Sequence, residues 1–322
     1  MKKFLLKLLL LLALIALPLF ALGTYYNHIS PVSYEMGSSP EAMPEQIDLA
    51  VVGSSHAMYG MKLEQYSENF FSFAMPGQTP QYDWRMLREY EDHIADGATI
   101  LMDVSYMSPF WTEPESEFLE KQTRYYRVLS KENIVDYDFK DALRVRLNQA
   151  IPASRILYTD LAALIGTIQE KGFRTAEVQA EEVPAETVEP TAVWFQDIPH
   201  QQDVLRKKHQ GLITPVFPDM NPPMQLAYEG MAAMAKEHNW RLIAVTTPFT
   251  ESYNDIYDQE FFRVFYDYTD QLFTSQGIEY WDYSHDPEFL NAHGYFVDLD
   301  HLSPAGAAHF SEILARRLQL IP

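Results

Sequence analysis

Short apolar runs alternate with longer segments of helical periodicity along most of the chain. Apolar runs of four to eight residues bounded by turn residues are typical of buried strands. They occur at residues 46–53, 70–75, 99–104, 241–247 and 278–283. Helical patterns cover residues 82–95, 131–150, 154–171, 223–239 and 257–275, and Ser303-Pro304 predicts the start of a last helix. Strands that alternate with helices form parallel βαβ units, so we expect an α/β domain with a parallel sheet of about five strands.

The chain begins with a basic tip and a long apolar run. The basic residues are Lys2, Lys3 and Lys7. The run at residues 8–22 is typical of a secretory signal peptide or an uncleaved membrane anchor, and the small residues Ala21 and Gly23 would permit cleavage. Because lysines stay on the cytoplasmic side, we expect a single-pass protein with an extracytoplasmic domain, or a secreted one if the signal is cleaved. A buried core helix is the alternative interpretation.

One stretch breaks the alternation of strands and helices. Residues 175–191 contain five glutamates, two prolines and no basic residue, which is typical of a solvated linker or loop. We expect a signal anchor or signal peptide at residues 1–23, a linker at 24–44 and an α/β domain at 45–322. An insertion at about 172–222, which could form a lid, would interrupt this domain.

Composition and charge narrow the classes of function. The 322 residues are 47% hydrophobic, which is enough for a sizeable core, and 24 Lys+Arg against 45 Asp+Glu give a net charge of −21. Phosphate binding depends on Lys and Arg, so this charge argues against a nucleic-acid partner. The chain has no cysteine, which excludes disulfides, thiolate metal sites and cysteine nucleophiles. Its chemistry must therefore come from oxygen and nitrogen groups.

A serine-rich turn, Gly53-Ser54-Ser55-His56, follows the first predicted strand. The carboxyl ends of parallel strands are where sites form in open sheets, and a serine on a turn into a helix there can receive backbone N–H support for an oxyanion. The alternative is a turn in which Ser54 or Ser55 caps the next helix. His56 could contact substrate or could be a neutral turn residue.

A second polar segment, Asp298-Leu299-Asp300-His301, precedes the last predicted helix. Asp298 and His301 are three residues apart on a loop, so the carboxylate can orient the imidazole as in a catalytic triad. The alternatives are an acidic loop that caps the helix, or a metal site formed by Asp298, Asp300 and His301. No fourth ligand has a recognisable spacing, so we expect neither a metal nor another cofactor.

Two further turns could supply hydrogen-bond donors to an oxyanion. Gly77 follows the second predicted strand, and Ser105 follows the third. Backbone N–H groups at such turns, together with the amide of Ser55, would complete an oxyanion hole. Each turn alone is an ordinary loop signal.

The order of these motifs along the chain resembles that of the SGNH/GDSL hydrolase superfamily. Ser55 matches its nucleophile, Gly77 its second-block glycine, and Asp298 and His301 its final Asp-x-x-His block. The sequence departs from the family at Ser54, where an aspartate is usual, and at residues 105–111, which replace the Gly-x-Asn-Asp block. Both departures are more similar to the membrane-anchored branch, which includes the D-alanyl transfer protein of teichoic-acid modification and alginate-type O-acetylation proteins.

The resemblance implies a flavodoxin-like three-layer sandwich and catalysis through an acyl-serine intermediate. A cell-envelope glycan would accept an acetyl or D-alanyl group, and a membrane-bound O-acyltransferase could be the partner. The triad does not separate an acyltransferase from an esterase. Two other classes stay open: a non-catalytic envelope scaffold that binds a polysaccharide or an acyltransferase, and a secreted carboxylesterase or lipase.

Overall fold

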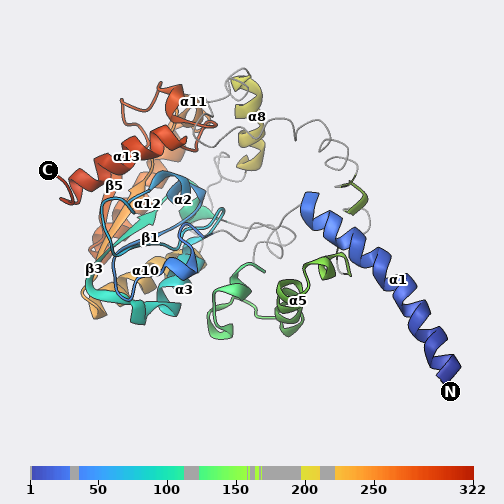
Figure 1. The fold of residues 1–322 in the computed structure, drawn as a ribbon. Coiled ribbons are helices and arrows are strands. Elements are labelled where there is room, and N and C mark those ends of the chain that lie inside the picture. The colour runs from blue at the N-terminus through green and yellow to red at the C-terminus, as the bar shows by residue number, and fades with distance from the viewer. Residues whose placement is uncertain are drawn as a thin grey trace. The chain divides into compact units, whose positions relative to one another are not determined.

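The computed structural model describes residues 2–29, 36–111, 123–157, 159, 164–166, 168, 197–210 and 222–322 (Figure 1). The chain divides into two compact units. The first comprises residues 1–34 and 116–187, and the second comprises residues 35–115 and 188–322. The predicted domain at 45–322 with its insertion at about 172–222 thus has different boundaries from these units.

The second unit is built around a parallel sheet of five strands. The strands are β1 (Ile47–Val52), β2 (Phe70–Ser72), β3 (Ile94–Asp103), β4 (Arg241–Thr246) and β5 (Glu279–Asp282). Their order is β2-β1-β3-β4-β5, and every neighbouring pair is parallel. Each predicted apolar run contains or overlaps one of these strands, so the α/β class and the five-stranded parallel sheet are confirmed.

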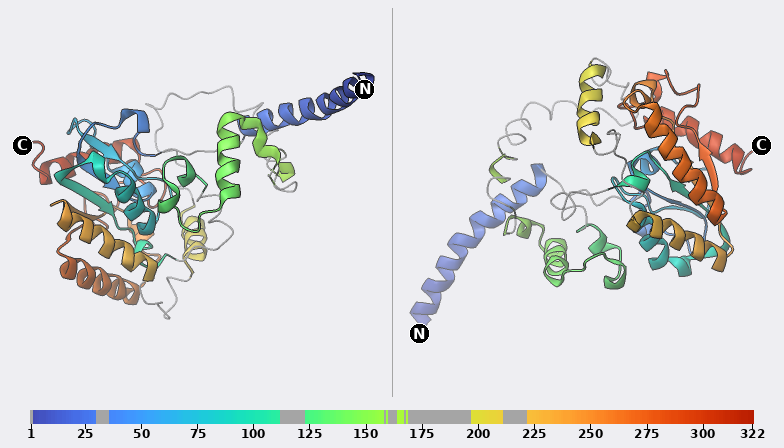
Figure 2. Two further views of the ribbon diagram at one scale, coloured as in Figure 1. Left: turned by 90° about the horizontal axis from the view of Figure 1, so that it is seen from below. Right: turned by 180° about the vertical axis from the view of Figure 1, so that it is seen from behind.

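Helices cover both faces of this sheet, as two further views show (Figure 2). Those of the second unit are α2 (Ser55–Gly60), α3 (Pro80–Glu89), α8 (Ile198–Lys208), α10 (Pro222–Glu237), α11 (Glu251–Asn254), α12 (Gln259–Gln276) and α13 (Pro304–Arg317). Short 3-10 turns lie at Pro40–Ala42, Glu91–His93, Ser108–Phe110 and His293–Tyr295. Alternate side chains of the strands pack with α2 and α13 in one buried cluster. On the opposite face α3 packs against α10, whose Tyr228 ring contacts Phe273 of α12.

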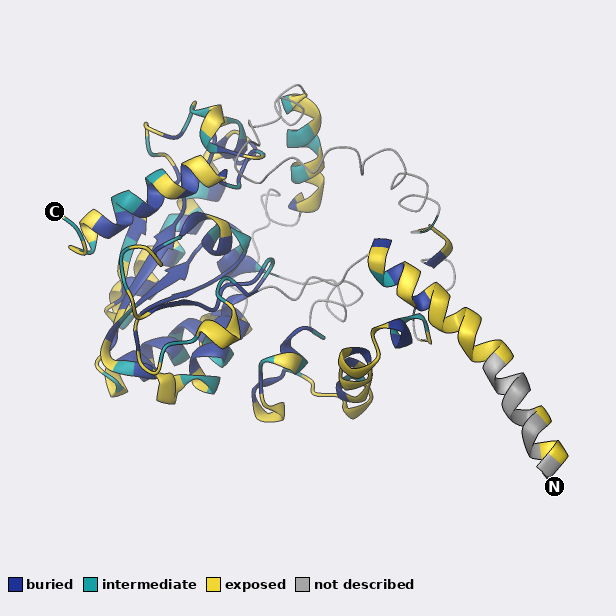
Figure 3. Ribbon diagram, in the orientation of Figure 1, coloured by how far each residue is buried: buried dark blue, intermediate teal, exposed yellow. Residues whose placement is uncertain are grey.

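Burial follows this layered arrangement (Figure 3). The core strands β1, β3 and β4 are almost wholly buried over their pairing segments, because both of their faces are covered. Only Asp48 of β1 and Arg241 of β4 are exposed in those two strands. Polar turns therefore follow the carboxyl ends of the three strands, at the edge of an apolar core.

One predicted helix is shorter than its pattern indicated. The sequence predicts a helix over residues 82–95, but α3 ends at Glu89 and β3 already begins at Ile94. Ile94 is buried and pairs with Ile47 of β1, so strand pairing overrides the helical pattern at this residue. Gly97 then adopts a φ of 83°, a left-handed conformation that glycine adopts without strain, and the register with β1 shifts there.

The first unit contains helices α1 (Lys2–Ile29) and α5 (Phe139–Ala150) with 3-10 turns at Tyr125–Arg127, Lys131–Asn133 and Pro152–Leu157. Helix α1 packs against the last of these turns, where the Arg155 guanidinium lies 4.7 Å from the Tyr26 ring centre. The helix predicted from residue 131 begins only at Phe139, because Asp138 caps it by accepting from the Lys140 amide. The one predicted over residues 154–171 begins as a 3-10 turn, and most of its remainder lies outside the described residues.

Among the residues that the structure describes, no helix has the length and apolarity needed to cross a membrane. The predicted N-terminal span therefore stays a prediction. Of the predicted insertion at about 172–222, the described part is residues 197–210 and Pro222. There, Gln202 donates to the Ser252 carbonyl at 2.8 Å, and His209 hydrogen-bonds the Tyr257 hydroxyl at 2.8 Å.

Candidate active site

The turn after β1 contains a glycine, Gly53, that no other residue type could replace. Gly53 has a φ of 138°, and a Cβ there would lie 2.3 Å from the Cβ of Asp103. Both the backbone conformation and the close approach therefore require glycine. The next residue, Ser54, caps α2 by accepting from the His56 amide at 3.3 Å. The capping alternative thus applies to Ser54, while Ser55 begins the helix with its hydroxyl free for other contacts.

A buried carboxylate accepts two hydrogen bonds from Ser54 and fixes its position. Asp103, the last residue of β3, accepts from the Ser54 hydroxyl at 2.6 Å and from its amide at 3.2 Å. Both residues are buried. The neighbouring strands β1 and β3 therefore hold the turn in place through one side chain. The sequence indicates that Asp103 ends a strand, but it does not indicate this contact.

The structure brings the three predicted catalytic residues together. The Ser55 hydroxyl lies 2.8 Å from Nε2 of His301, although 246 residues separate them. Nδ1 of His301 lies 3.0 and 3.1 Å from the two carboxylate oxygens of Asp298. Asp298 also accepts from the backbone amides of Asp300 and His301, at 3.1 and 2.7 Å, so the loop holds its own carboxylate in place. Serine, imidazole and carboxylate thus have the contacts of a catalytic triad.

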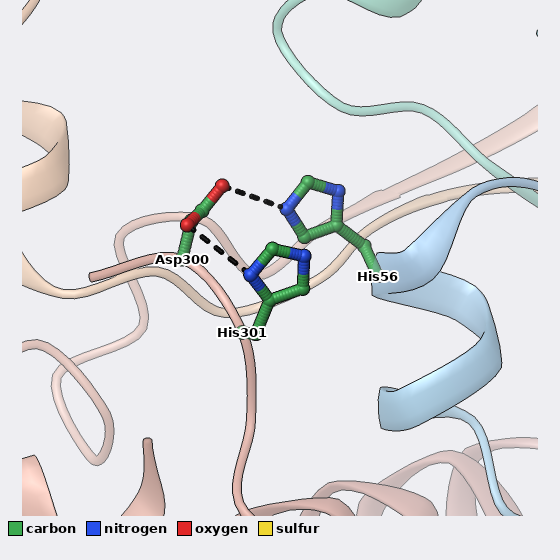
Figure 4. A group of neighbouring side chains, drawn as sticks. All are labelled: His56, Asp300 and His301. Carbon is green, nitrogen blue, oxygen red and sulfur yellow. Dashed lines mark hydrogen bonds and ion pairs between the residues drawn. The ribbon is translucent and has the colours of Figure 1, made fainter. Parts of the chain in front are cut away.

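A second carboxylate lies against the same imidazole (Figure 4). Asp300 is 3.3 Å from Nδ1 of His301 through one oxygen and 3.2 Å from Nε2 of His56 through the other. The two imidazole rings stack, with centres 4.8 Å apart and planes 14° from parallel. The other ring nitrogen of His56 lies 3.2 Å from the Ser54 hydroxyl. Because both of its nitrogens have protein partners, His56 is not placed as the predicted substrate contact.

These contacts shift the pKa values of His301 and Asp300. Burial works against a charge on His301, but Asp300 and Asp298 outweigh it and raise the pKa of His301 to about 10. Burial would raise the pKa of Asp300, but the neighbouring His301 and then His56 lower it well below its usual value. The loop therefore favours a protonated imidazole beside ionised carboxylates.

The three residues His56, Asp300 and His301 also form a group whose ligand atoms lie within 4.8 Å of one another. This differs from the predicted metal alternative, which used Asp298 in place of His56. The lone pair of an imidazole nitrogen lies in the plane of its ring, and these two planes are almost parallel. The two lone pairs do not converge on one ion, whereas each Asp300 oxygen already faces one ring. The geometry therefore fits a bridging carboxylate better than a metal ion.

Two of the three predicted oxyanion donors fit the structure. The Met75 amide donates to the Gly53 carbonyl at 3.1 Å, which holds the turn at Gly77 beside the turn that carries Ser54 and Ser55. Gly77 has a φ of 64°, and within the described residues neither its amide nor that of Ser55 donates to a protein group. Including Ser105 was wrong: it is buried, its amide donates to Ser108 Oγ at 3.1 Å, and the two hydroxyls hydrogen-bond at 3.0 Å.

An apolar cavity of about 500 Å³ opens beside the triad, between α2 and the start of α13. Its lining is Tyr59, Lys62, Glu64, Gln65, Val297, Leu302, Pro304, Ala307 and Ala308. The Tyr59 ring stands edge-on to His301, with ring centres 6.1 Å apart, and Leu302 directly follows His301. Apolar cavities of this size with a few polar groups at one side are typical of small-molecule sites.

No protein-family model matches this chain, and no curated protein matches its sequence. The function must therefore be argued from the geometry. A serine hydroxyl against an imidazole, a carboxylate on the far ring nitrogen and unpaired amides at two turns can carry out nucleophilic acyl transfer.

Proposed function

We propose that this protein is an extracytoplasmic serine acyltransferase or esterase that acts on O-acyl groups of a cell-envelope glycopolymer. The observation that carries the proposal is the 2.8 Å contact between Ser55 Oγ and His301 Nε2, with Asp298 on the opposite ring nitrogen. A hydroxyl and an imidazole at this distance can exchange a proton directly. The carboxylate holds the imidazole in the tautomer that accepts it.

The reaction proceeds by double displacement. Nε2 of His301 takes the Ser55 proton while Oγ attacks the carbonyl carbon of an ester, and the amides of Ser55 and Gly77 stabilise the oxyanion. Collapse breaks the ester C–O bond, and His301 returns the proton to the leaving alkoxide. A sugar hydroxyl or water then attacks the acyl-serine while Nε2 of His301 takes its proton. The bond between the acyl carbon and Ser55 Oγ breaks, the proton returns to Oγ, and the product is the transferred ester or the free acid. The chemistry at Ser55 is the same for both acceptors.

The fold supports a place in the SGNH/GDSL superfamily. The strand order β2-β1-β3-β4-β5 is the flavodoxin-like order, and the nucleophile turn follows the first strand at the switch point of that order. The Asp-x-x-His loop leads into α13, and the contacts among Ser55, Asp298 and His301 support the same place. An acetyl or D-alanyl donor ester would enter beside Tyr59, and the cavity there leaves room for the rest of its molecule.

We also propose that the protein stays at the cell membrane through its N-terminal helix. Large apolar side chains are exposed along α1, among them Phe4, Leu14, Leu17 and Phe20. The basic tip would keep this end on the cytoplasmic side. In this location the enzyme could receive its acyl group from a membrane-bound O-acyltransferase and pass it to a glycan. Cell fractionation with an antibody to the intact N-terminus tests the location, since release to the medium would favour the secreted esterase.

Replacing the nucleophile tests the proposal. The full-length Ser55→Ala variant should lose fluorophosphonate labelling and at least 10³-fold of its turnover of nitrophenyl acetate, because the acyl-serine cannot form. Ser67→Ala is a matched control: Ser67 lies in the turn after α2, and its hydroxyl has no partner within the described residues. If Ser55→Ala is labelled and turns over ester like the wild type, the proposal is wrong.

A non-catalytic scaffold is the second candidate, and the contact of His301 with two carboxylates favours it. The raised pKa of His301 favours a protonated ring at neutral pH, and a protonated imidazole cannot accept the Ser55 proton. A scaffold of this kind would bind a glycan without reacting with fluorophosphonates. Equal background hydrolysis by the wild type and His301→Ala would support it.

A further inference from the structure

A chain of hydrogen bonds runs behind the triad from one carboxylate to another. It begins at Asp103, passes through the Ser54 hydroxyl at 2.6 Å and reaches Nδ1 of His56 at 3.2 Å. It continues from Nε2 of His56 to Asp300 at 3.2 Å. The side chains of His56 and Asp300 are only 10% and 11% exposed, so water contributes little to these bonds.

Counting protons along this chain gives the charge of His56. Three hydrogen bonds need three protons. The Ser54 hydroxyl supplies one, a neutral His56 supplies one, and two carboxylates that act only as acceptors supply none. The Ser54 hydroxyl donates to Asp103, so both bonds of His56 must use its own ring protons. All three bonds form when His56 carries a proton on each nitrogen and is a cation.

The position of this cation matters for the base. Its ring is stacked on His301 with the centres 4.8 Å apart, while Asp300 touches both rings. A positive charge at this distance opposes a second positive charge on His301. It also pairs with Asp300 and so leaves that carboxylate less able to hold a proton on His301. Asp298 still orients the ring through its own contacts.

We propose that His56, held as a cation between Ser54 and Asp300, keeps His301 neutral so that it can accept the Ser55 proton. This role rests on the proposed acyl transfer at Ser55. His56 is a positioning and charge-setting residue, since it touches His301 rather than the reacting atoms. It resolves the conflict between a base that must be neutral and a loop whose two carboxylates favour its charged form.

The other titratable groups around His56 and His301 do not supply a positive charge that could keep His301 neutral. His209 of the α8 segment is buried, and burial lowers its pKa to about 4 despite the attraction of Asp300. Burial raises the pKa of Tyr253 and Tyr257, so both hydroxyls are neutral at physiological pH. Phe249 covers the edge of the His56 ring, with ring centres 5.3 Å apart. Among the described groups around His301, His56 is therefore the one whose positive charge can oppose a charge on His301.

The test compares the pH dependence of kcat/KM for nitrophenyl acetate in full-length variants. Two unit charges about 5 Å apart at an effective dielectric of about 20 interact by on the order of two pH units. In His56→Gln, which removes the charge but keeps a donor toward Asp300, the acid limb should move to higher pH by at least about one unit. Activity at neutral pH should fall about tenfold and recover at high pH. In Asp300→Asn the limb should move to lower pH.

Two further variants separate charge from shape. His56→Lys restores a cation and should bring the acid limb back toward the wild-type position. His309→Gln changes a histidine that pairs with Glu288 at 3.0 Å on the exposed side of α13, and its limb should coincide with that of the wild type. A His56→Gln limb that stays in place or moves to lower pH overturns the inference, as does a nitrogen NMR spectrum that shows His56 as a neutral tautomer at pH 7.

The two proposals fail in different ways. If wild type and Ser55→Ala hydrolyse the ester equally at every pH, acyl transfer at Ser55 is wrong. If hydrolysis needs Ser55 but His56→Gln leaves the acid limb unchanged, only the role of His56 is wrong.

Discussion

Two pairs of acidic residues flank the nucleophile turn, and they have opposite surroundings. Asp83 and Asp103 lie beneath it, both buried, with hydroxyl and amide partners such as Ser54 and Gln78. Asp298 and Asp300 lie on the loop above it, in contact with two imidazoles. Within the described part of the chain, the hydrogen-bond partners of the lower pair include no cation, and burial raises the pKa of Asp83 well above its usual value. The same residue type thus supports the backbone below the turn and sets proton affinity above it.

The largest contrast should appear in activity. Asp298→Asn removes the carboxylate that accepts from Nδ1 of His301 and should lower kcat by on the order of 10³-fold, because the ring loses its orientation and charge support. The free energy of unfolding should change little, since Asp298 is partly exposed. Steady-state ester hydrolysis and urea unfolding of the same samples check both expectations. A loss of stability without a loss of kcat would reverse the assignment of the two pairs.

The buried pair should show its effect in stability. Asp103→Ala leaves the Ser54 hydroxyl and amide without their acceptor and should lower the free energy of unfolding by about 2 kcal/mol. Asp48→Ala is the matched control, because Asp48 is an exposed strand residue whose side chain accepts from Asn69, and it should change stability by less than about 0.5 kcal/mol. Equal effects of the two substitutions in urea unfolding would contradict a supporting role for Asp103.

A third effect, visible only as a function of pH, is expected at Asp83. Burial raises the pKa of this carboxyl well above 3.8 in the folded chain, while in the unfolded chain it ionises near its ordinary value of 3.8. The folded state then binds more protons, so this group lowers stability as pH rises above 3.8, by up to about 1.4 kcal/mol per unit until the folded pKa is reached. Asp83→Asn lacks this ionisation, and its stability relative to wild type should increase from pH 4 to pH 8.

Urea unfolding at several pH values measures that difference. A gap between Asp83→Asn and wild type that is constant with pH would mean that Asp83 is already ionised in the folded protein. The Gln78 amide, which donates to Asp83 at 2.8 Å, would then be stabilising a charge.

The sequence predicts most of the sheet because its strands are continuous apolar runs. Such runs must be buried on both faces, which a parallel sheet between two layers of helices provides. It also predicts Ser55, Asp298 and His301, since each lies at the end of an element where parallel strands direct their loops. It does not predict that Asp300 bridges two stacked rings, because this depends on the relative position of two turns 244 residues apart. Nor does it predict the bond between Ser105 and Ser108, which turns an apparent oxyanion donor into a packing element.

The distance along the chain between Ser55 and His301 bears on how the protein is made. During synthesis the nucleophile turn leaves the ribosome 246 residues ahead of its base. At roughly 5–20 residues per second, this interval is on the order of ten seconds or longer. Throughout that time the chain carries an ordinary serine that cannot attack the esters it meets. In the proposed mechanism, reactivity begins only when the last helix has docked, so a chain that is still being synthesised, or that is cut short before α13, stays chemically inert.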